Sequence, residues 1–142
     1  MNHLFPQSVS PRDQTQSRLM LLAAGFVCLY AAALTLAPAV RLHTWQAELR
    51  WAHWLGVAVW MSTFALLHRL LLRQLPDRDP YLLPAAALLT GWGLITIWRL
   101  EPQFGLRQTL WLAVSGGVFA LGLRIPDPLR LLRRYKYLWL TS

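Results

Sequence analysis

Two histidines, His53 and His68, could carry the most chemistry, because they lie in or beside an uncharged apolar run that begins at Trp51. Histidines inside a membrane can ligate haem or relay protons. Fifteen residues separate the two, which is about 22 Å along a helix axis, so they lie at opposite ends of the run. The other apolar runs hold no histidine that could complete a haem-binding pair. A haem site is therefore disfavoured, and two histidines at the interfaces are favoured.

Carboxylates, cysteines and known motifs give no sign of catalysis. The six acids all lie in tails or loops between apolar runs: Asp13, Glu48, Asp77, Asp79, Glu101 and Asp127. Neither a P-loop, a GxSxG nor an HExxH motif occurs. The single cysteine, Cys28, allows no intrachain disulfide and no zinc-type cluster. From the residues alone we expect no active site, no metal and no cofactor.

The composition is that of a membrane protein. Only 14% of the 142 residues are charged, while 56% are hydrophobic and the mean hydropathy is +0.36. Soluble domains usually have about 25% charged residues. A much lower share indicates membrane spans, because a bilayer penalises charge wherever the chain crosses it. The net charge of +8 would suggest nucleic acid on a soluble protein. Here the basic residues cluster at the ends of apolar runs, so we expect membrane lipid as the partner and no nucleic acid.

Four apolar runs are long enough to cross a hydrocarbon core of about 30 Å. They are Leu19–Val40, Trp51–His68, Tyr81–Trp98 and Phe104–Leu123. We therefore predict an all-α, polytopic integral membrane protein with four transmembrane helices, plus the start of a fifth at residues 137–142. Polar residues 1–18 predict a disordered cytoplasmic tail.

A cleaved signal peptide is the competing interpretation of the first run, because Ala37–Ala39 mimics a small-residue cleavage site. The run is longer than the roughly 7 to 15 apolar residues of a signal peptide, and further apolar runs follow it. An uncleaved membrane helix is favoured.

Prolines bracket the third run. Asp79-Pro80 suits a helix start, where the first amides lack partners and the dipole favours an acid. Glu101-Pro102 predicts the end of that helix, because a residue before proline disfavours the α conformation.

Arginine and lysine predict the sidedness. With the N-terminus in the cytoplasm, the inside segments hold ten basic residues and the outside loops hold four, which satisfies the positive-inside rule. Several tryptophans fall at the predicted outer ends, where amphipathic rings suit the headgroup region: Trp45, Trp51, Trp54, Trp98 and Trp111. Trp60 and Trp92 lie deep in their runs and are expected to pack in the core.

Two further patterns suggest contacts. Ala87 with Gly91, and Ala113 with Gly117, are small residues at helical spacing that let membrane helices approach closely, although chance in Ala- and Gly-rich helices could also produce them. A basic segment close to the membrane predicts contact with anionic headgroups, although topology alone would also produce it: Arg130, Arg133, Arg134 and Lys136.

From Asp79 onward the chain resembles the SEDS family, of the RodA, FtsW and SpoVE type. The residues that carry the resemblance are DPYLLPAAALLTGWGLITIWRLEP, then RQTLW at Arg107–Trp111, then RIPDPLRLLRRYKYLWL. On this basis residues 74–142 resemble the start of the SEDS core, and residues 19–73 resemble the two-helix extension that some members carry before it.

The resemblance implies an enzyme of the bacterial cytoplasmic membrane that polymerises lipid II into peptidoglycan, paired with a class B penicillin-binding protein in cell elongation, division or sporulation. The essential acid of the family lies downstream, beyond the helices present here, so no catalytic residue is carried over. We expect the chain to be an N-terminal fragment that is itself inactive.

Two alternatives come from other functional classes. The chain could be a small membrane-embedded structural subunit of a larger complex. It could also be a cofactor-binding electron-transfer subunit, which the histidine spacing disfavours.

Overall fold

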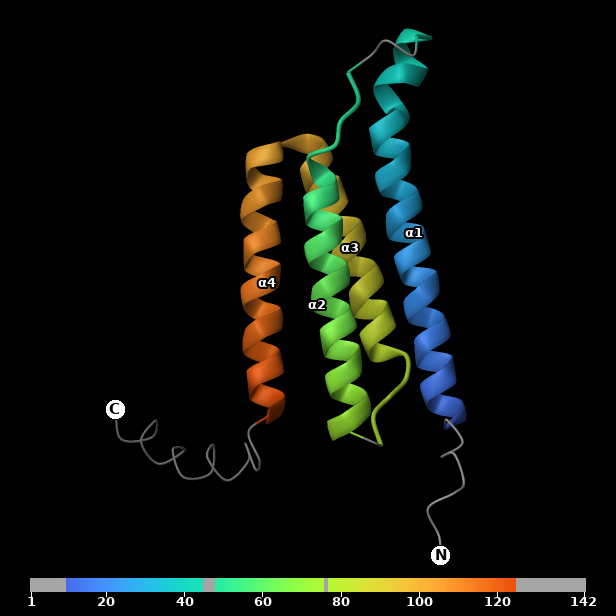
Figure 1. The fold of residues 1–142 in the computed structure, drawn as a ribbon, viewed down its shortest axis with the longest axis vertical. Coiled ribbons are helices and arrows are strands. Elements are labelled where there is room, and N and C mark those ends of the chain that lie inside the picture. Colours follow the sequence, from blue (N-terminus) through green and yellow to red (C-terminus); the bar gives the residue numbers. More distant parts are fainter. Residues whose placement is uncertain (1–9, 45–47, 76, 125–142) are drawn as a thin grey trace, which may run out of the picture.

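The computed structural model describes residues 10–44, 48–75 and 77–124, and in these ranges the chain forms four α-helices and no strand. They are α1 (Pro11–Leu42), α2 (His53–Gln74), α3 (Leu82–Leu100) and α4 (Pro102–Arg124). The helices run alternately up and down beside one another (Figure 1). The predicted all-α fold with four membrane-length helices is confirmed. The predicted start of a fifth helix lies outside the described residues.

The bundle has two ends, which we name for the rest of the text. The near end holds the start of α1, the connection from α2 to α3 and the last turn of α4 (Figure 1). The far end holds the connection from α1 to α2 and the turn from α3 to α4. Helices α2, α3 and α4 all pack on one another, and α1 packs mainly on α3.

The outer faces of the helices are suited to lipid. In the most apolar window of α4 only 17% of the residues are buried, and in the other three helices about a third or fewer are. Large apolar side chains are exposed on every helix, among them Leu21, Leu66, Leu89 and Phe119. In water such a surface would be strongly unfavourable, whereas in lipid it costs nothing. The chain is a multi-pass membrane protein.

Aromatic packing holds α2 against α3. Trp60 of α2 is 1% exposed, and its Nε1 donates a hydrogen bond to the carbonyl oxygen of Ala87 at 3.0 Å. The Trp60 ring also lies 5.4 Å from the Phe64 ring, centroid to centroid. A membrane interior offers no water to satisfy an indole N–H, so this bond to a backbone carbonyl lets the large ring be buried.

The first helix begins earlier than the sequence predicts. Residues 11–18 were expected to belong to a disordered tail, but α1 starts at Pro11. Proline suits the first helical position, and Asp13 in the first turn favours the helix dipole. Side chains of these first two turns also find hydrogen-bond partners on other helices, as the next subsection describes.

The bracketing prolines of the third run act at both ends of α3. The Oδ1 atom of Asp79 accepts a hydrogen bond from the backbone N–H of Tyr81 at 2.8 Å, just before the helix starts. At the other end Glu101 is extended, with φ −149° and ψ 110°, and α4 begins directly at Pro102. The turn between α3 and α4 is therefore a single extended residue before a proline.

Two tryptophans differ from their expected places. Trp98, expected in the headgroup belt, is 7% exposed and packs inside the bundle at the far end. Trp92, expected in the core, is 54% exposed, and its ring lies 4.9 Å from that of Tyr30, centroid to centroid. Both outcomes follow from which face of α3 each residue occupies, and depth along the helix does not reveal the face.

Candidate functional site

Arg78, in the connection from α2 to α3, links three segments at the near end. Its Nη2 atom forms an ion pair with Oδ1 of Asp13 at 2.6 Å, and its Nε donates to Oε1 of Gln16 at 2.6 Å. Its Nη1 donates to the carbonyl oxygens of Leu71 and Leu75, at 3.3 and 2.8 Å. Arg78 therefore caps the C-terminus of α2 and holds the first turns of α1 against it.

His68 continues this network. Because Gln16 accepts from Arg78 through its oxygen, its Nε2 amide group faces His68 and donates to Nδ1 at 3.1 Å. The other ring nitrogen, Nε2, then carries the proton and donates to Oγ of Ser17 at 3.2 Å. Both ring nitrogens of His68 are occupied by these hydrogen bonds, which leaves neither to ligate a haem iron. We call these side chains the Arg78 cluster: Asp13, Gln16, Ser17, His68 and Arg78.

His53 belongs to a second polar cluster, near the far end, and is 3% exposed. Its Nε2 lies 2.9 Å from the carbonyl oxygen of Ala31, which can only accept, so this nitrogen is the donor. The hydroxyl of Thr35 lies 3.2 Å from the same nitrogen and accepts from Nε1 of Trp54 at 2.9 Å. The two histidines thus lie at opposite ends of α2, as their spacing predicts, and each one bonds to α1. His53 is enclosed by the bundle.

The small residues of α3 lie where three helices meet. Ala87 is 0% exposed and Gly91 is buried. A Cβ atom added at Gly91 would lie 2.5 Å from Cγ2 of Val27 and 3.0 Å from the ring of Trp60. The absence of a side chain at Gly91 is what lets α1 and α2 come this close to α3.

The small residues of α4 differ from the expectation. Ala113 and Gly117 are exposed, and a Cβ atom added at Gly117 would meet nothing within 4 Å in the described part of the chain. The glycines of α4 that do face another helix are Gly105, which lies against Trp98, and Gly116, which lies against Thr63. Spacing finds pairs of small residues, but it does not tell which pair faces inward.

The remaining predicted residues take no part in a described site. The basic residues expected to contact lipid headgroups lie outside the described residues, so that contact stays a prediction: Arg130, Arg133, Arg134 and Lys136. Within the described ranges no three His, Cys, Asp or Glu side chains gather where they could hold a metal ion.

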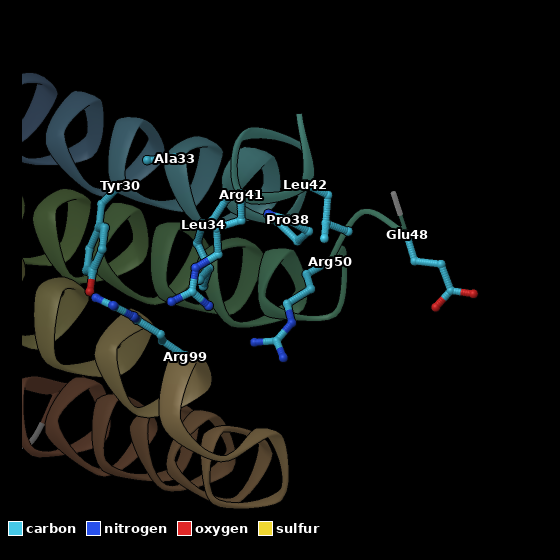
Figure 2. Close-up of a pocket in the computed structure, with 10 residues that line it drawn as sticks. Tyr30, Ala33, Leu34, Pro38, Arg41, Leu42, Glu48, Arg50 and Arg99 are labelled. Carbon is cyan, nitrogen blue, oxygen red and sulfur yellow. The ribbon is translucent and has the colours of Figure 1, made fainter. Parts of the chain in front are cut away.

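A hollow of about 950 Å³ opens at the far end between α1, the connection after it and the end of α3. Figure 2 shows three arginines that enter it from different segments, Arg41 from α1, Arg50 from the connection and Arg99 from α3. The rest of its lining is Tyr30, Ala33, Leu34, Ala37, Pro38, Leu42 and Glu48. From the sequence, these arginines are only counted among the basic residues of the outside loops, because their spacing does not show that their side chains meet.

Comparison with known proteins finds a similarity to an enzyme of cell-wall synthesis. No family model and no solved structure matches the chain. The chain is similar to the peptidoglycan glycosyltransferase RodA of Mycobacterium leprae (strain TN), with 33% identity over 143 aligned positions. The match includes 92% of this chain and 30% of the relative, so the chain spans less than a third of that protein's length.

The extent of the match also bears on the first two helices. Residues 74–142 make up less than half of the chain, so a match to 92% of it must include most of α1 and α2 as well. The four-helix membrane bundle is thus similar, over nearly all of its length, to part of a peptidoglycan glycosyltransferase.

Proposed function

We propose that the chain belongs to the SEDS family and forms the N-terminal part of a peptidoglycan glycosyltransferase that polymerises lipid II. The observation that carries this proposal is the 33% identity to the Mycobacterium leprae RodA over 92% of the chain. Two further observations support it. The motifs from Asp79 onward occur in the family's order, and all four described helices are long and apolar enough to span a membrane. In the whole protein the partner would be a class B penicillin-binding protein, and the process would be wall synthesis in cell elongation or division.

In this proposal the bundle supports the chemistry and does not perform it. Among the described acids, Asp13 is paired with Arg78, and the others are exposed in connections: Glu48, Asp77, Asp79 and Glu101. An exposed carboxylate has no water-excluded pocket in which to act. The fragment alone is therefore inactive, and its role is to position the helices that follow in the whole enzyme.

A chimaera tests the proposal. The segment of the Mycobacterium leprae RodA that matches this chain is replaced by this chain, and the purified chimaera is assayed for polymerisation of lipid II. We expect the chimaera to retain polymerisation within about a hundredfold of the parent, since a misplacement of about 1 Å far from the chemistry can cost about that factor in rate. The chain alone should give no polymer.

Two controls make the result decisive. The parent protein without the matched segment should be inactive, which shows that the segment is needed at all. Polymer from the chain alone, or a chimaera that inserts into the membrane in normal amount but makes no polymer, would contradict the proposal.

The proposal includes an orientation, in the bacterial cytoplasmic membrane with the near end and the N-terminus facing the cytoplasm. Ten basic residues then lie inside and four outside. The test uses a Cys28→Ser background with a single new cysteine, either Ser10→Cys at the near end or Leu49→Cys at the far end. A membrane-impermeant maleimide added to intact spheroplasts should label the second variant and leave the first unlabelled until the membrane is permeabilised. The reverse pattern would show that the orientation is wrong.

A further inference from the structure

Within the described part of the chain, the three arginines of the far-end hollow differ from Arg78 in having no hydrogen-bond or ion-pair partner. Arg78 uses all three of its guanidinium nitrogens on Asp13, Gln16 and the end of α2. Arg41, Arg50 and Arg99 make no hydrogen bond and no ion pair with any residue in the described ranges. Arginines at the ends of α1 and α3 could have bonded to the last carbonyls of those helices, and these do not.

The hollow concentrates positive charge. Three guanidinium groups and one carboxylate, that of Glu48, line it, which leaves a net charge of about +2. Figure 2 shows the Glu48 carboxylate directed away from the arginines, so it does not neutralise them. In the same view Arg99 extends toward Tyr30, and Arg41 and then Arg50 lie on the side toward the connection. Three guanidinium groups that line the same hollow, each with several N–H donors, suit the oxygens of a phosphate group.

The wall beside the arginines is apolar. Side chains from the last turns of α1 form it, namely Ala33, Leu34, Ala37, Pro38 and Leu42. The hollow lies at the end of membrane-spanning helices, the level at which a lipid carries its headgroup. An apolar wall that leads from lipid depth to a group of arginines matches a molecule with a hydrocarbon tail and an anionic head.

We propose that this hollow binds a phosphate ester, held by Arg41, Arg50 and Arg99, with any hydrocarbon tail of the ligand along the α1 wall. The source of the phosphate is either the headgroup of a membrane lipid or a soluble phosphate ester. The site is independent of the glycosyltransferase proposal, because it uses only residues of the described bundle and no part of the lipid II reaction.

The experiment measures binding by native mass spectrometry of the purified 142-residue chain in detergent micelles, with three probes. Dioleoyl phosphatidic acid has both phosphate and tails, dioleoylglycerol has the tails alone, and glycerol 3-phosphate has the phosphate alone. The site variant carries Arg41→Gln, Arg50→Gln and Arg99→Gln. The matched control carries Arg12→Gln, Arg18→Gln and Arg73→Gln, which removes the same charge from exposed arginines at the near end.

We expect the site variant to bind phosphatidic acid about a hundredfold more weakly than the unchanged chain, at roughly fivefold per arginine removed. The control variant should lose no more than about threefold. Arg50→Gln alone, which lies in a connection and does not disturb a helix, should lose about fivefold and covers the case in which the triple variant does not fold.

The probes identify the source of the phosphate. Binding of phosphatidic acid alone shows a lipid headgroup site, and arginine-dependent binding of glycerol 3-phosphate as well shows that a soluble ester also enters. Equal losses in the site and control variants would overturn the proposal, because the attraction would then be general. Binding of dioleoylglycerol as tight as that of phosphatidic acid would overturn it too, because the arginines would then contribute nothing.

Discussion

Arg78→Met is expected to lower the free energy of unfolding of the bundle by about 3 kcal/mol, the lower end for breaking a buried ion pair by removing one partner. Methionine retains the apolar stem and removes every hydrogen bond of the guanidinium group. The Arg78 side chain is only 9% exposed, whereas Asp13 is 32% exposed and can regain water, which places the expected loss at the lower end of the range. Gln16, which is 0% exposed, loses the donor to its oxygen, and the end of α2 loses its cap.

Unfolding by SDS in mixed micelles measures this effect, with tryptophan fluorescence as the signal because Trp60 and Trp98 are buried. Arg73→Met is the matched control, since Arg73 is an exposed arginine in the last turn of α2. It should change the free energy of unfolding by less than about 0.5 kcal/mol. Equal effects of the two substitutions would show that the Arg78 cluster does not stabilise the bundle.

Gly105→Ala is expected to lower the free energy of unfolding by about 1 to 2 kcal/mol, as overpacking of a rigid site does. A Cβ atom at Gly105 would lie 2.5 Å from Cδ2 and 2.6 Å from Cγ of the Trp98 ring. The Trp98 ring cannot move aside, because Gly56 packs against its Nε1 and Cδ1 atoms on the opposite edge. The same Nε1 donates a hydrogen bond to the Thr109 hydroxyl at 3.1 Å.

Gly117→Ala on the same helix is the matched control. A Cβ atom there meets nothing within 4 Å in the described part of the chain, so alanine should leave the stability unchanged or raise it by up to about 1 kcal/mol through its higher helix propensity. The same SDS titration reports both variants. A stability loss at Gly117 equal to that at Gly105 would show that the close approach to Trp98 is not what matters.

The helices themselves could be predicted because a bilayer leaves few choices. Any long uncharged run must satisfy its own backbone, and only a helix does so within one segment. The ends of α3 were also predictable, since Asp79, Pro80 and Pro102 act on their immediate neighbours. The start of α1 was not. Asp13 and Gln16 look like tail residues until Arg78, more than sixty positions later, is placed beside them.

The inward faces could not be predicted, and the reason is again the solvent. In water one face of a helix is apolar and the other polar, which shows the core side. In lipid both faces are apolar, so Trp92 and Trp98 carry the same signal in the sequence although one is exposed and the other buried. For the same reason the small residues Gly91 and Gly117 look alike, but of these two only Gly91 lies between helices of the described bundle.

The far-end hollow shows a third limit of the sequence. Arg41, Arg50 and Arg99 come from three segments, and each one alone is an ordinary basic residue at the end of an apolar run. Only the packing of α1 on α3 brings them to one space. A site assembled from the ends of separate helices leaves no local motif.

The position of Arg78 has a consequence for how the protein is made. The first helix leaves the ribosome before residue 78 does, so Asp13 and Gln16 reach the border of the bilayer while the guanidinium group they bond to is still absent. Those two polar groups stay at the aqueous border until the connection after α2 emerges and supplies the guanidinium group. The contacts between α1 and the end of α2 are thus complete only after Arg78, which follows α2, has docked on α1.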